Sequence, residues 1–502
     1  MMTVLVVGAG PTGLSLACGL LVQGVPVRVV DSAAGPAATS RALGLQPRGQ
    51  EVLRRLGAFD GLPQRAVDIR ATGIHVAGRK VVDVGAALGS DGPRMLWIPQ
   101  TEVEARLRAR LAELGGSVEW GVAVRSLVQD ADGVDVELAG GERLHAAWAI
   151  GCDGAHSQVR KSAGIGFPGA SVLERFLLAD VHLERAGAAG TFLGTGGQFV
   201  AMPLPHPDGD LWRLMAPAPD GMGSEPDEAE ILRLLSRLAV ERAGFTQLRV
   251  KGAEWTSVFR FHRRLADSYR SGRMLLAGDA AHIHSPLGGQ GLNTGIGDAE
   301  NLAFKLALVI SGRAGESLLD TYTAERRPVA KSVLAATSFG TKLGFAEKRA
   351  VQLLFAATAP VLRMPIVQRR LLRASSQLGI SYRHGPLAAA PARRVRALGG
   401  PRAGDRMPNI WTRDAAGRRG RLHDRLEAGW ALLASGTAGD CARVASERLG
   451  EANVRVLAPE TGSLPEVCLV RPDAHLAWRG TGIDELTRWL DAALAPGRVT
   501  RP

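Results

Sequence analysis

The chain has 502 residues, more than one hydrophobic core usually supports, so two or three domains are expected. Hydrophobic residues make up 46% and charged residues 22%, an ordinary globular composition that excludes a membrane-spanning bundle and a disordered chain. The formal net charge of +12 comes from Lys and Arg spread along the whole sequence without interleaved aromatics, so we expect no nucleic-acid partner.

The chain opens with a pattern of strand, helix and strand. Thr3 to Val7 is a continuous apolar run, Leu14 to Leu21 is helical in composition, and Val27 to Val30 reads as a second buried strand. The first strand begins so early that no secretory signal precedes it. Apolar stretches elsewhere are shorter than the ~18 to 20 residues that span a bilayer. We therefore expect a βαβ unit in a cytoplasmic protein without a membrane anchor.

The remaining elements follow in chain order. Thr101 to Leu114 has a helical period, and strands are expected at Val134 to Leu138 and Leu144 to Ile150. From Leu173 to Val258, strand-like runs broken by Gly and Pro predict a mainly β region. The runs that define it include Gln198 to Leu204 and Leu211 to Met215, and a strand at Leu275 to Ala277 and a helix at Asp298 to Ile310 come after it. A Pro- and Arg-rich linker is expected from Pro386 to Pro408, before a third region of mixed helices and strands.

The first turn carries the pattern G-x-G-x-x-G, formed by Gly8, Gly10 and Gly13 together with Pro11 and Thr12. Directly after a strand and before a helix, the first glycine permits a tight turn, the second lets a pyrophosphate approach, and the third lets helix and strand pack closely. The helix N-terminus then faces the phosphates. Asp31 ends the second strand, where its carboxylate can accept hydrogen bonds from ribose hydroxyls and would repel a 2′-phosphate. The site therefore fits FAD or NAD rather than NADP.

A second glycine-rich helix entry lies between Gly272 and Asn293. A strand ends there, Asp279 follows it, and a helix starts near Gly291. Asp279 can accept a hydrogen bond from the ribityl chain of a flavin, and backbone amides near Leu292 and Asn293 can face the flavin pyrimidine edge. Because NAD needs no second helix entry of this kind, the motif favours FAD. We expect no metal, since no cluster of metal ligands is apparent.

With these motifs, the chain resembles the single-component (class A) flavoprotein aromatic hydroxylases, which have the para-hydroxybenzoate hydroxylase fold, and most closely their polyketide-tailoring branch. The resemblance runs through nearly the whole chain. The matching segments are the glycine motif, Ser40 to Ala42, Ile98 to Gln100, Gly151 to Ser157, Gly278-Asp279, and Tyr322 with Glu325 to Pro328.

The resemblance implies an α/β fold with three domains. These are a discontinuous Rossmann-type FAD-binding domain (residues 1–172 and 270–385), a middle β-sheet substrate domain (173–269, joined by roughly 70–97), and a C-terminal thioredoxin-like α/β domain (395–502). The last domain contains no C-x-x-C motif, so we assign it a structural or assembly role.

The resemblance also implies roles for single residues. Arg41 is similar to an arginine that reaches the cofactor, Gln100 to a glutamine beside the ribityl chain, and Val124 to a residue whose backbone meets adenine. Asp153 would orient neighbouring backbone, with Arg160 closing that segment. Pro286 would lie next to the substrate and flavin C4a, so Arg41 and Pro286 are the catalytic candidates.

The implied activity is an FAD-dependent monooxygenase that hydroxylates an aromatic, polyketide-derived substrate. NADPH or NADH would bind transiently and reduce FAD, and O2 would then add at C4a to give a hydroperoxide that attacks an electron-rich carbon. Substrate contacts are expected between the middle sheet and the flavin. The candidates are Phe199, Met202, Trp212, Leu214 and Phe261.

Two alternatives remain open on sequence alone. One is a related oxygen insertion, either a Baeyer-Villiger step or the inactivation of a rifamycin-type antibiotic. The other is a flavin-binding protein that is not a monooxygenase. The sequence also leaves open whether the chain forms a homodimer.

Overall fold

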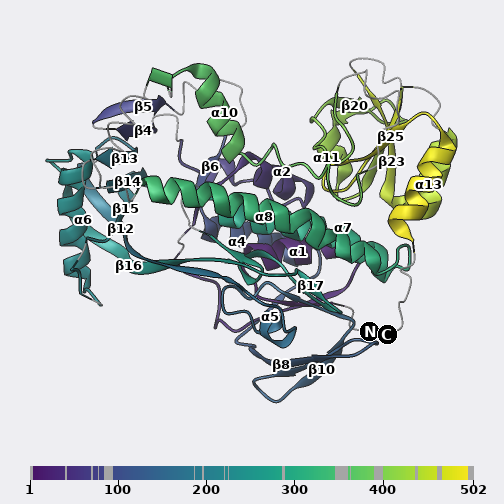
Figure 1. The fold of residues 1–502 in the computed structure, drawn as a ribbon, viewed down its shortest axis with the longest axis horizontal. Coiled ribbons are helices and arrows are strands. Elements are labelled where there is room, and N and C mark those ends of the chain that lie inside the picture. Colours follow the sequence, from purple (N-terminus) through teal and green to yellow (C-terminus); the bar gives the residue numbers. More distant parts are fainter. Residues whose placement is uncertain are drawn as a thin grey trace.

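The computed structural model describes residues 4–39, 42–68, 72–76, 78–83, 94–185, 187–194, 197–219, 221–223, 225–284, 289–344, 360–361, 363–388, 400–435, 439–460 and 466–495. In Figure 1, helix α6 (Glu228–Ala243) lies on the left beside a large sheet, a separate mixed domain lies at the upper right, and the long helix α8 (Ser317–Gly344) runs between them. None of the described helices is both long and apolar enough to cross a membrane.

The N-terminal region is built on a six-stranded sheet whose central strands are parallel. β1 lies between β2 and β11, and four fully buried or nearly buried apolar residues, Val4 to Val7, make it the centre of the largest hydrophobic core. In spatial order the strands are β17 (Arg270–Ser271), β18 (Met274–Leu276), β11 (Trp148–Gly151), β1 (Val4–Val7), β2 (Val27–Asp31) and β7 (Val118–Trp120).

Helices and short strands surround this sheet. Helix α1 packs against α7 and α4, and the three-stranded sheet β10-β9-β8 extends from the edge. The helices are α1 (Pro11–Val22), α2 (Pro47–Arg55), α4 (Gln100–Glu113), α5 (Gln158–Ser162), α7 (Gln290–Ile310), α8 and α10 (Pro365–Ser375), with short turns η1 (Pro63–Arg65) and η2 (Gly278–Ala280). The other strands are β3 (Leu43–Leu45), β6 (Leu96–Pro99), β8 (Val124–Gln129), β9 (Val134–Leu138) and β10 (Arg143–Ala146).

The middle region is an eight-stranded, mostly antiparallel sheet with α6 against one face. Two of its strands, β4 and β5, come from the N-terminal part of the chain. In spatial order the strands are β19 (His282–Ile283), β16 (Arg249–Leu265), β12 (Gly169–Arg185), β15 (Leu211–Pro217), β14 (Gly197–Pro203), β13 (Gly190–Gly194), β4 (Gly73–Val76) and β5 (Arg79–Asp83).

The C-terminal region is a second mixed sheet. Strands β22 and β23 are parallel and joined by α12, whereas β24 and β25 are antiparallel and lead into α13, the arrangement of a thioredoxin-like domain. The elements are β20 (Trp411–Arg413), β21 (Arg419–Arg421), α11 (Leu422–Leu426), β22 (Trp430–Leu433), α12 (Gly439–Leu449), η4 (Glu451–Asn453), β23 (Val454–Pro459), β24 (Val467–Val470), β25 (Leu476–Gly480) and α13 (Ile483–Leu494). The expected α/β fold class is confirmed.

Three expected elements differ from the structure. The run Leu144 to Ile150 is divided between β10 and β11, which belong to different sheets. Helix α7 begins at Gln290, near the expected helix start but well before Asp298. Helix α6 was missed inside the β region, although Asp227 accepts a hydrogen bond from the Glu230 amide and Gly244 ends the helix with a φ of +72°. Asp-x-x-Glu before an apolar run and a glycine after it are sequence signals of a helix.

A buried ionic cluster joins the C-terminal region to helices α7 and α8. The Arg471 guanidinium donates to both Glu325 carboxylate oxygens, at 2.7 and 2.8 Å, and also to Asp473. Lys305 donates to Glu325 at 2.8 Å, and Asn301 donates to Glu325 and Asp473. Phe304 and Leu308 of α7 share a hydrophobic core with Trp430 and Trp478, so the two regions are packed together firmly.

This cluster predicts that the C-terminal contact weakens in acid. Burial alone would raise the pKa of Glu325, but Arg471 and Lys305 outweigh it and lower that pKa to about 2. The stabilisation is therefore complete above the ordinary glutamate pKa of ~4.3 and is lost as the pH falls toward 2. We expect the thermal unfolding temperature to fall over this pH range. In the Glu325→Gln variant, that temperature should depend less on pH. An unchanged profile in that variant would contradict the assignment.

Candidate functional site

The turn between β1 and α1 can be built only with glycine at two of its positions. Gly8 has a φ of +104°, and a Cβ atom there would lie 2.3 Å from the Cys152 carbonyl oxygen. A Cβ atom on Gly13 would lie 1.9 Å from the Gly8 carbonyl oxygen. The strand and the helix therefore approach too closely for any side chain at either position.

Gly10 differs, because a Cβ atom on it would meet nothing within 4 Å. Gly10 is the N-cap of α1, and no side chain caps this helix end. The first backbone amides of a helix lack intrahelical partners and carry a partial positive charge. An open, uncapped helix N-terminus is suited to receive a phosphate group.

Asp31, at the end of β2, lies beside this turn. Its Oδ2 accepts from the Ala9 amide at 2.7 Å and its Oδ1 from the Ala33 amide at 2.8 Å. Each carboxylate oxygen keeps a second lone pair for a ligand hydroxyl. The Val122 amide donates to the Asp31 carbonyl, which brings the start of β8, and with it Val124, next to this strand end.

The Asp153 carboxylate holds the segment after β11. Its Oδ2 accepts from the amides of Gln158 and Val159, at 2.6 and 3.2 Å, and so caps α5. Its Oδ1 is buried without a hydrogen-bond partner among the described residues. Arg160 donates to the carbonyls of Ala155 and Ala280 and thereby ties this segment to the turn after β18. An unpaired buried carboxylate oxygen is costly, so it fits a place where a bound group donates.

Asp279 lies in that turn, exposed between the buried residues Gly278 and Ala280. No residue that the structure describes donates a hydrogen bond to the Asp279 carboxylate. Gly278 has a φ of +62°, and a Cβ atom on it would lie 2.6 Å from Thr12 Oγ1. The turn is thus pressed against the N-terminus of α1 while its carboxylate faces outward.

The N-terminal part of α7 also lies next to the N-terminus of α1. A Cβ atom on Gly295 would lie 2.1 Å from Thr12 Oγ1, so the two helix N-termini converge on one pair of turns. Gly291 faces the His284 ring, and Leu292 is mostly buried. The Asn293 side chain accepts from the Gln46 amide at 2.8 Å and donates to the Gly44 carbonyl, which fixes the strand β3 beside this helix end.

One further predicted residue is described by the structure, and two lie outside the described residues. Gln100 begins α4, where its side chain donates to Glu104 at 2.7 Å and its amide to the Ala42 carbonyl. Arg41 and Pro286 are not among the described residues, so their positions stay predictions.

A buried polar chain lies behind α7, and its contacts were not predicted from the sequence. The His282 Nε2 lies 2.6 Å from Asp298 Oδ2, and Arg326 donates to Asp298 Oδ1 at 2.7 Å and to the Tyr382 hydroxyl at 2.9 Å. Burial alone would raise the pKa of Asp298, but Arg326 and His282 outweigh it and lower that pKa. The chain locks the turn after β18 to α7 and α8. Arg326 belongs to the segment Glu325 to Pro328 that resembles the family, but no sequence signal indicated that it pairs with Asp298.

The predicted substrate residues lie on two different faces of the middle sheet. Phe199, Trp212 and Leu214 belong to the hydrophobic core beneath α6. Met202 lies on the opposite face, because successive residues of a strand alternate. Phe261 is on β16, and its side chain is not among those that the structure describes.

The face that carries Met202 turns toward the N-terminal region. Met202 pairs in register with Arg213, which donates two hydrogen bonds of 2.7 Å to the Asp180 carboxylate. Leu211, two residues before Arg213, packs with Leu43 of β3. A Cβ atom on Gly289 would lie 2.7 Å from the Leu43 carbonyl oxygen, so this face adjoins the N-terminus of α7.

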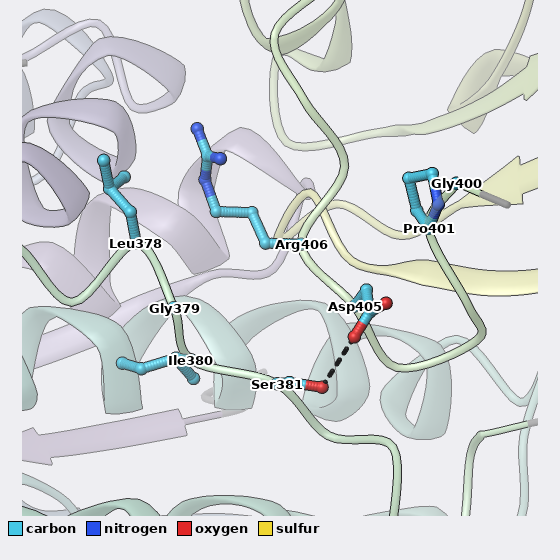
Figure 2. Close-up of a pocket in the computed structure, with 8 residues that line it drawn as sticks. All are labelled: Leu378, Gly379, Ile380, Ser381, Gly400, Pro401, Asp405 and Arg406. Atoms are coloured by element: carbon cyan, nitrogen blue, oxygen red, sulfur yellow. Dashed lines mark hydrogen bonds between the residues drawn. The ribbon is translucent and has the colours of Figure 1, made fainter. Parts of the chain in front are cut away.

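A pocket of about 320 Å³ lies elsewhere, where the segment 378–381 runs beside residues 400–406. Figure 2 shows Ser381 hydrogen-bonded to Asp405, at 2.9 Å, across this pocket. It contains none of the residues predicted to bind FAD or substrate.

Comparison with known proteins decides the family. Residues 1–337 match the family described as FAD binding domain, and residues 400–496 match the C-terminal domain of aromatic-ring hydroxylases. The chain belongs to the FAD-dependent aromatic-ring hydroxylases. This confirms the expected family and its cofactor, FAD, and the hydroxylase is an FAD-dependent monooxygenase.

Individual relatives cover most or all of the hydroxylase. It is 37% identical over 406 residues to 6-methylpretetramide 4-monooxygenase of Streptomyces rimosus, covering 76% of this chain and 70% of that one. It is 36% identical to rifampicin monooxygenase of Streptomyces venezuelae, covering 99% of this chain and 100% of that one. The solved structure of OxyS anhydrotetracycline hydroxylase from Streptomyces rimosus superposes with a TM-score of 0.80 at 32% identity, covering 99% of each chain.

Proposed function

We propose that the hydroxylase inserts one oxygen atom into a polycyclic aromatic substrate of polyketide type. The observation that carries this proposal is the convergence of two helix N-termini, α1 and α7, on one pair of turns beside the Met202 face of the middle sheet. A site with two positive helix ends accommodates both the pyrophosphate and the flavin ring of one FAD molecule. The relatives that act on tetracycline precursors support the substrate class.

The proposed site offers residues for each part of FAD. Asp31 and Val124 would hold the adenosine end, Gly8 to Gly13 the pyrophosphate, and Asp279 with Gln100 the ribityl chain. Gly291, Leu292 and Asn293 would face the pyrimidine edge, with Arg41 and Pro286 beside the reacting ring. Asp153 would orient its segment against the cofactor through the unpartnered Oδ1. Bound FAD supplies electron transfer from NADPH or NADH to O2 and the transfer of one oxygen atom to the substrate.

The protein itself positions the substrate and excludes water. Met202 would offer an apolar contact to a planar ring system, while the buried ion pair of Arg213 and Asp180 supplies a fixed polar group next to it. Partly desolvated surroundings protect a reactive oxygen species from water. The N-terminus of α7 would face the pyrimidine edge of bound FAD, where its positive helix end would favour negative charge.

No separate nucleotide-binding fold for the nicotinamide coenzyme is evident in the sequence, since the glycine motif occurs once after a strand. We propose that NADPH or NADH binds transiently at the FAD site entrance, and that the enzyme works in the cytoplasm, where both coenzymes are supplied. A measurement of its molecular mass in solution would show whether the enzyme is a homodimer.

The test is an absorption spectrum of the purified protein, followed by NADPH and NADH oxidation under air with a panel of tetracyclic phenols and a rifamycin. We expect flavin bands, oxidation stimulated by the phenols, and a product that is heavier by one oxygen. Stimulation by the rifamycin alone would favour antibiotic inactivation, and a ring-expanded ester would favour a Baeyer-Villiger step. Oxidation that no compound stimulates would contradict the proposal.

Asp279→Ala is expected to weaken FAD binding by about 10- to 100-fold, the effect of losing a hydrogen bond to a charged group. Because Asp279 is exposed and makes no hydrogen bond to described residues, the apoprotein should unfold at an unchanged temperature. Quenching of flavin fluorescence measures the affinity. Asp132→Ala, on an exposed turn between β8 and β9, is the matched control. Equal FAD affinity in both variants would contradict the placement of Asp279.

A further inference from the structure

A cluster of histidines and carboxylates lies on the middle sheet, among residues that the FAD site does not use. His182 is on β12, Glu254 is on β16, and His206 and Asp210 lie in the connection from β14 to β15. His182 pairs in register with Leu211 on one side and Gly252 on the other, so three adjacent strands bring the cluster together.

The nitrogen and oxygen atoms of this cluster converge. His182, His206 and Glu254 each offer one ligand atom, and these atoms lie within 4.8 Å of one another. His182 Nε2 lies 3.3 Å from Glu254 Oε1. The two imidazole rings meet edge to face, with their centroids 5.0 Å apart. Small side-chain movements would bring the three atoms to the spacing of ligands around one ion.

Asp210 supplies a second, independent observation. Its Oδ1 lies 2.9 Å from His182 Nδ1, from which it can accept, and 3.3 Å from His206 Nδ1, which itself accepts from the Asp208 backbone amide at 3.4 Å. A proton fixed on the His182 Nδ1 leaves the Nε2 lone pair of that ring for a ligand. Histidines that bind metals usually donate their other ring nitrogen to a carboxylate in this way. Lys251 donates to the remaining oxygen, Oδ2, at 3.3 Å and holds Asp210 in place.

The charge of the cluster also favours a cation. Asp208 adds a third carboxylate, 3.8 Å from His206 Nδ1, to those of Asp210 and Glu254, and Lys251 pairs with Asp210. Two imidazole nitrogens and a carboxylate are ligands that suit Zn²⁺ and its neighbours, whereas Mg²⁺ and Ca²⁺ prefer oxygen ligands alone.

We propose that this cluster binds a divalent transition-metal ion, with Zn²⁺ as the reference ion. The ligands are Nε2 of His182, one ring nitrogen of His206 and the Glu254 carboxylate, Asp210 is the positioning residue for His182, and water completes the coordination. The ion has a structural role. It ties the connection from β14 to β15 to the sheet, and Leu204 and Leu211 at the ends of this connection pack on Leu43 and Trp97 of the FAD-binding region.

The test is calorimetric titration of the untagged, FAD-loaded, full-length protein with ZnCl2. We expect one equivalent of Zn²⁺ to bind, and the thermal unfolding temperature to rise with Zn²⁺. His206→Ala and Glu254→Gln should each abolish both effects, and Asp210→Asn should weaken the affinity by about 10- to 100-fold, as loss of an orienting carboxylate does elsewhere. His206 and Glu254 are at partly exposed positions, so these variants should fold.

His145→Ala is the matched control, because His145 also pairs with a carboxylate, Asp135 at 2.8 Å, but belongs to no described group of three ligands. This variant should bind Zn²⁺ like the unaltered protein. Absence of Zn²⁺ binding, or equal binding by the unaltered protein, His206→Ala and Glu254→Gln, would overturn the proposal.

Discussion

Gly10→Val is expected to abolish FAD binding while the protein stays folded. A Cβ atom on Gly10 meets nothing within 4 Å, and the residue has a φ of −70° and a ψ of −179°, which valine adopts easily. The added methyl groups would fill the open space in front of the α1 N-terminus, where the pyrophosphate must approach the backbone. We expect FAD affinity to fall roughly a thousandfold, about 4 kcal/mol, and NADPH oxidation to be lost with it.

Two variants make this result specific. Gly140→Val, in the connection from β9 to β10, also adds a side chain into open space and should leave FAD binding intact. Gly13→Val should instead prevent folding, because its Cβ atom would overlap the Gly8 carbonyl. Circular dichroism separates unfolding from loss of cofactor. A yellow, active Gly10→Val protein would contradict the placement of FAD at this turn.

Arg471→Met is expected to destabilise the protein by about 3 to 5 kcal/mol, the cost of breaking a buried ion pair on one side. In the native protein the carboxylates of Glu325 and Asp473 face the cations Arg471 and Lys305, all four within the interior. Removal of Arg471 leaves two buried carboxylates with one ammonium group. Urea denaturation followed by fluorescence measures the free energy of unfolding.

The matched control for this variant is Arg448→Met, which removes an exposed ion pair with Asp491. Exposed pairs contribute little, roughly 0 to 1 kcal/mol, so this variant should unfold almost like the unaltered protein. If both substitutions changed the free energy of unfolding equally, the buried cluster would not hold the C-terminal region in place.

Local sequence was sufficient for the elements whose constraints are local. The first βαβ unit was predicted because apolar runs and three glycines determine it within thirty residues of chain. The division of Leu144 to Ile150 was not predictable in the same way, because β10 pairs with the preceding strand β9, whereas β11 pairs with the distant strand β1. The capping residues of α6 could have revealed that helix.

Site residues could be proposed from the sequence where a motif carries them, but contacts that tertiary packing creates could not. Asp279 and Asp153 stand in recognisable segments, whereas the polar chain of Asp298 joins it to His282 and Arg326 and, through Arg326, to Tyr382, from separate parts of the chain. The substrate candidates show the same limit. Alternation along β15 separates Arg213 from Trp212 and Leu214, but only the position of α6 decides which face is buried against a helix.

Helix α7 serves two parts of the molecule, since its first turn lies beside the proposed FAD site, its Asn301 donates to Asp473 of the C-terminal region, and its Lys305 donates to Glu325, a partner of Arg471. A C-terminal domain taken from a relative should therefore be accepted only when the residue at the position of Glu325, which pairs with Arg471, is exchanged together with the domain. Over evolutionary time, Glu325, Arg471 and Asp473 should change together or not at all. Homologues that have lost one of the three should have replaced the whole cluster by apolar residues.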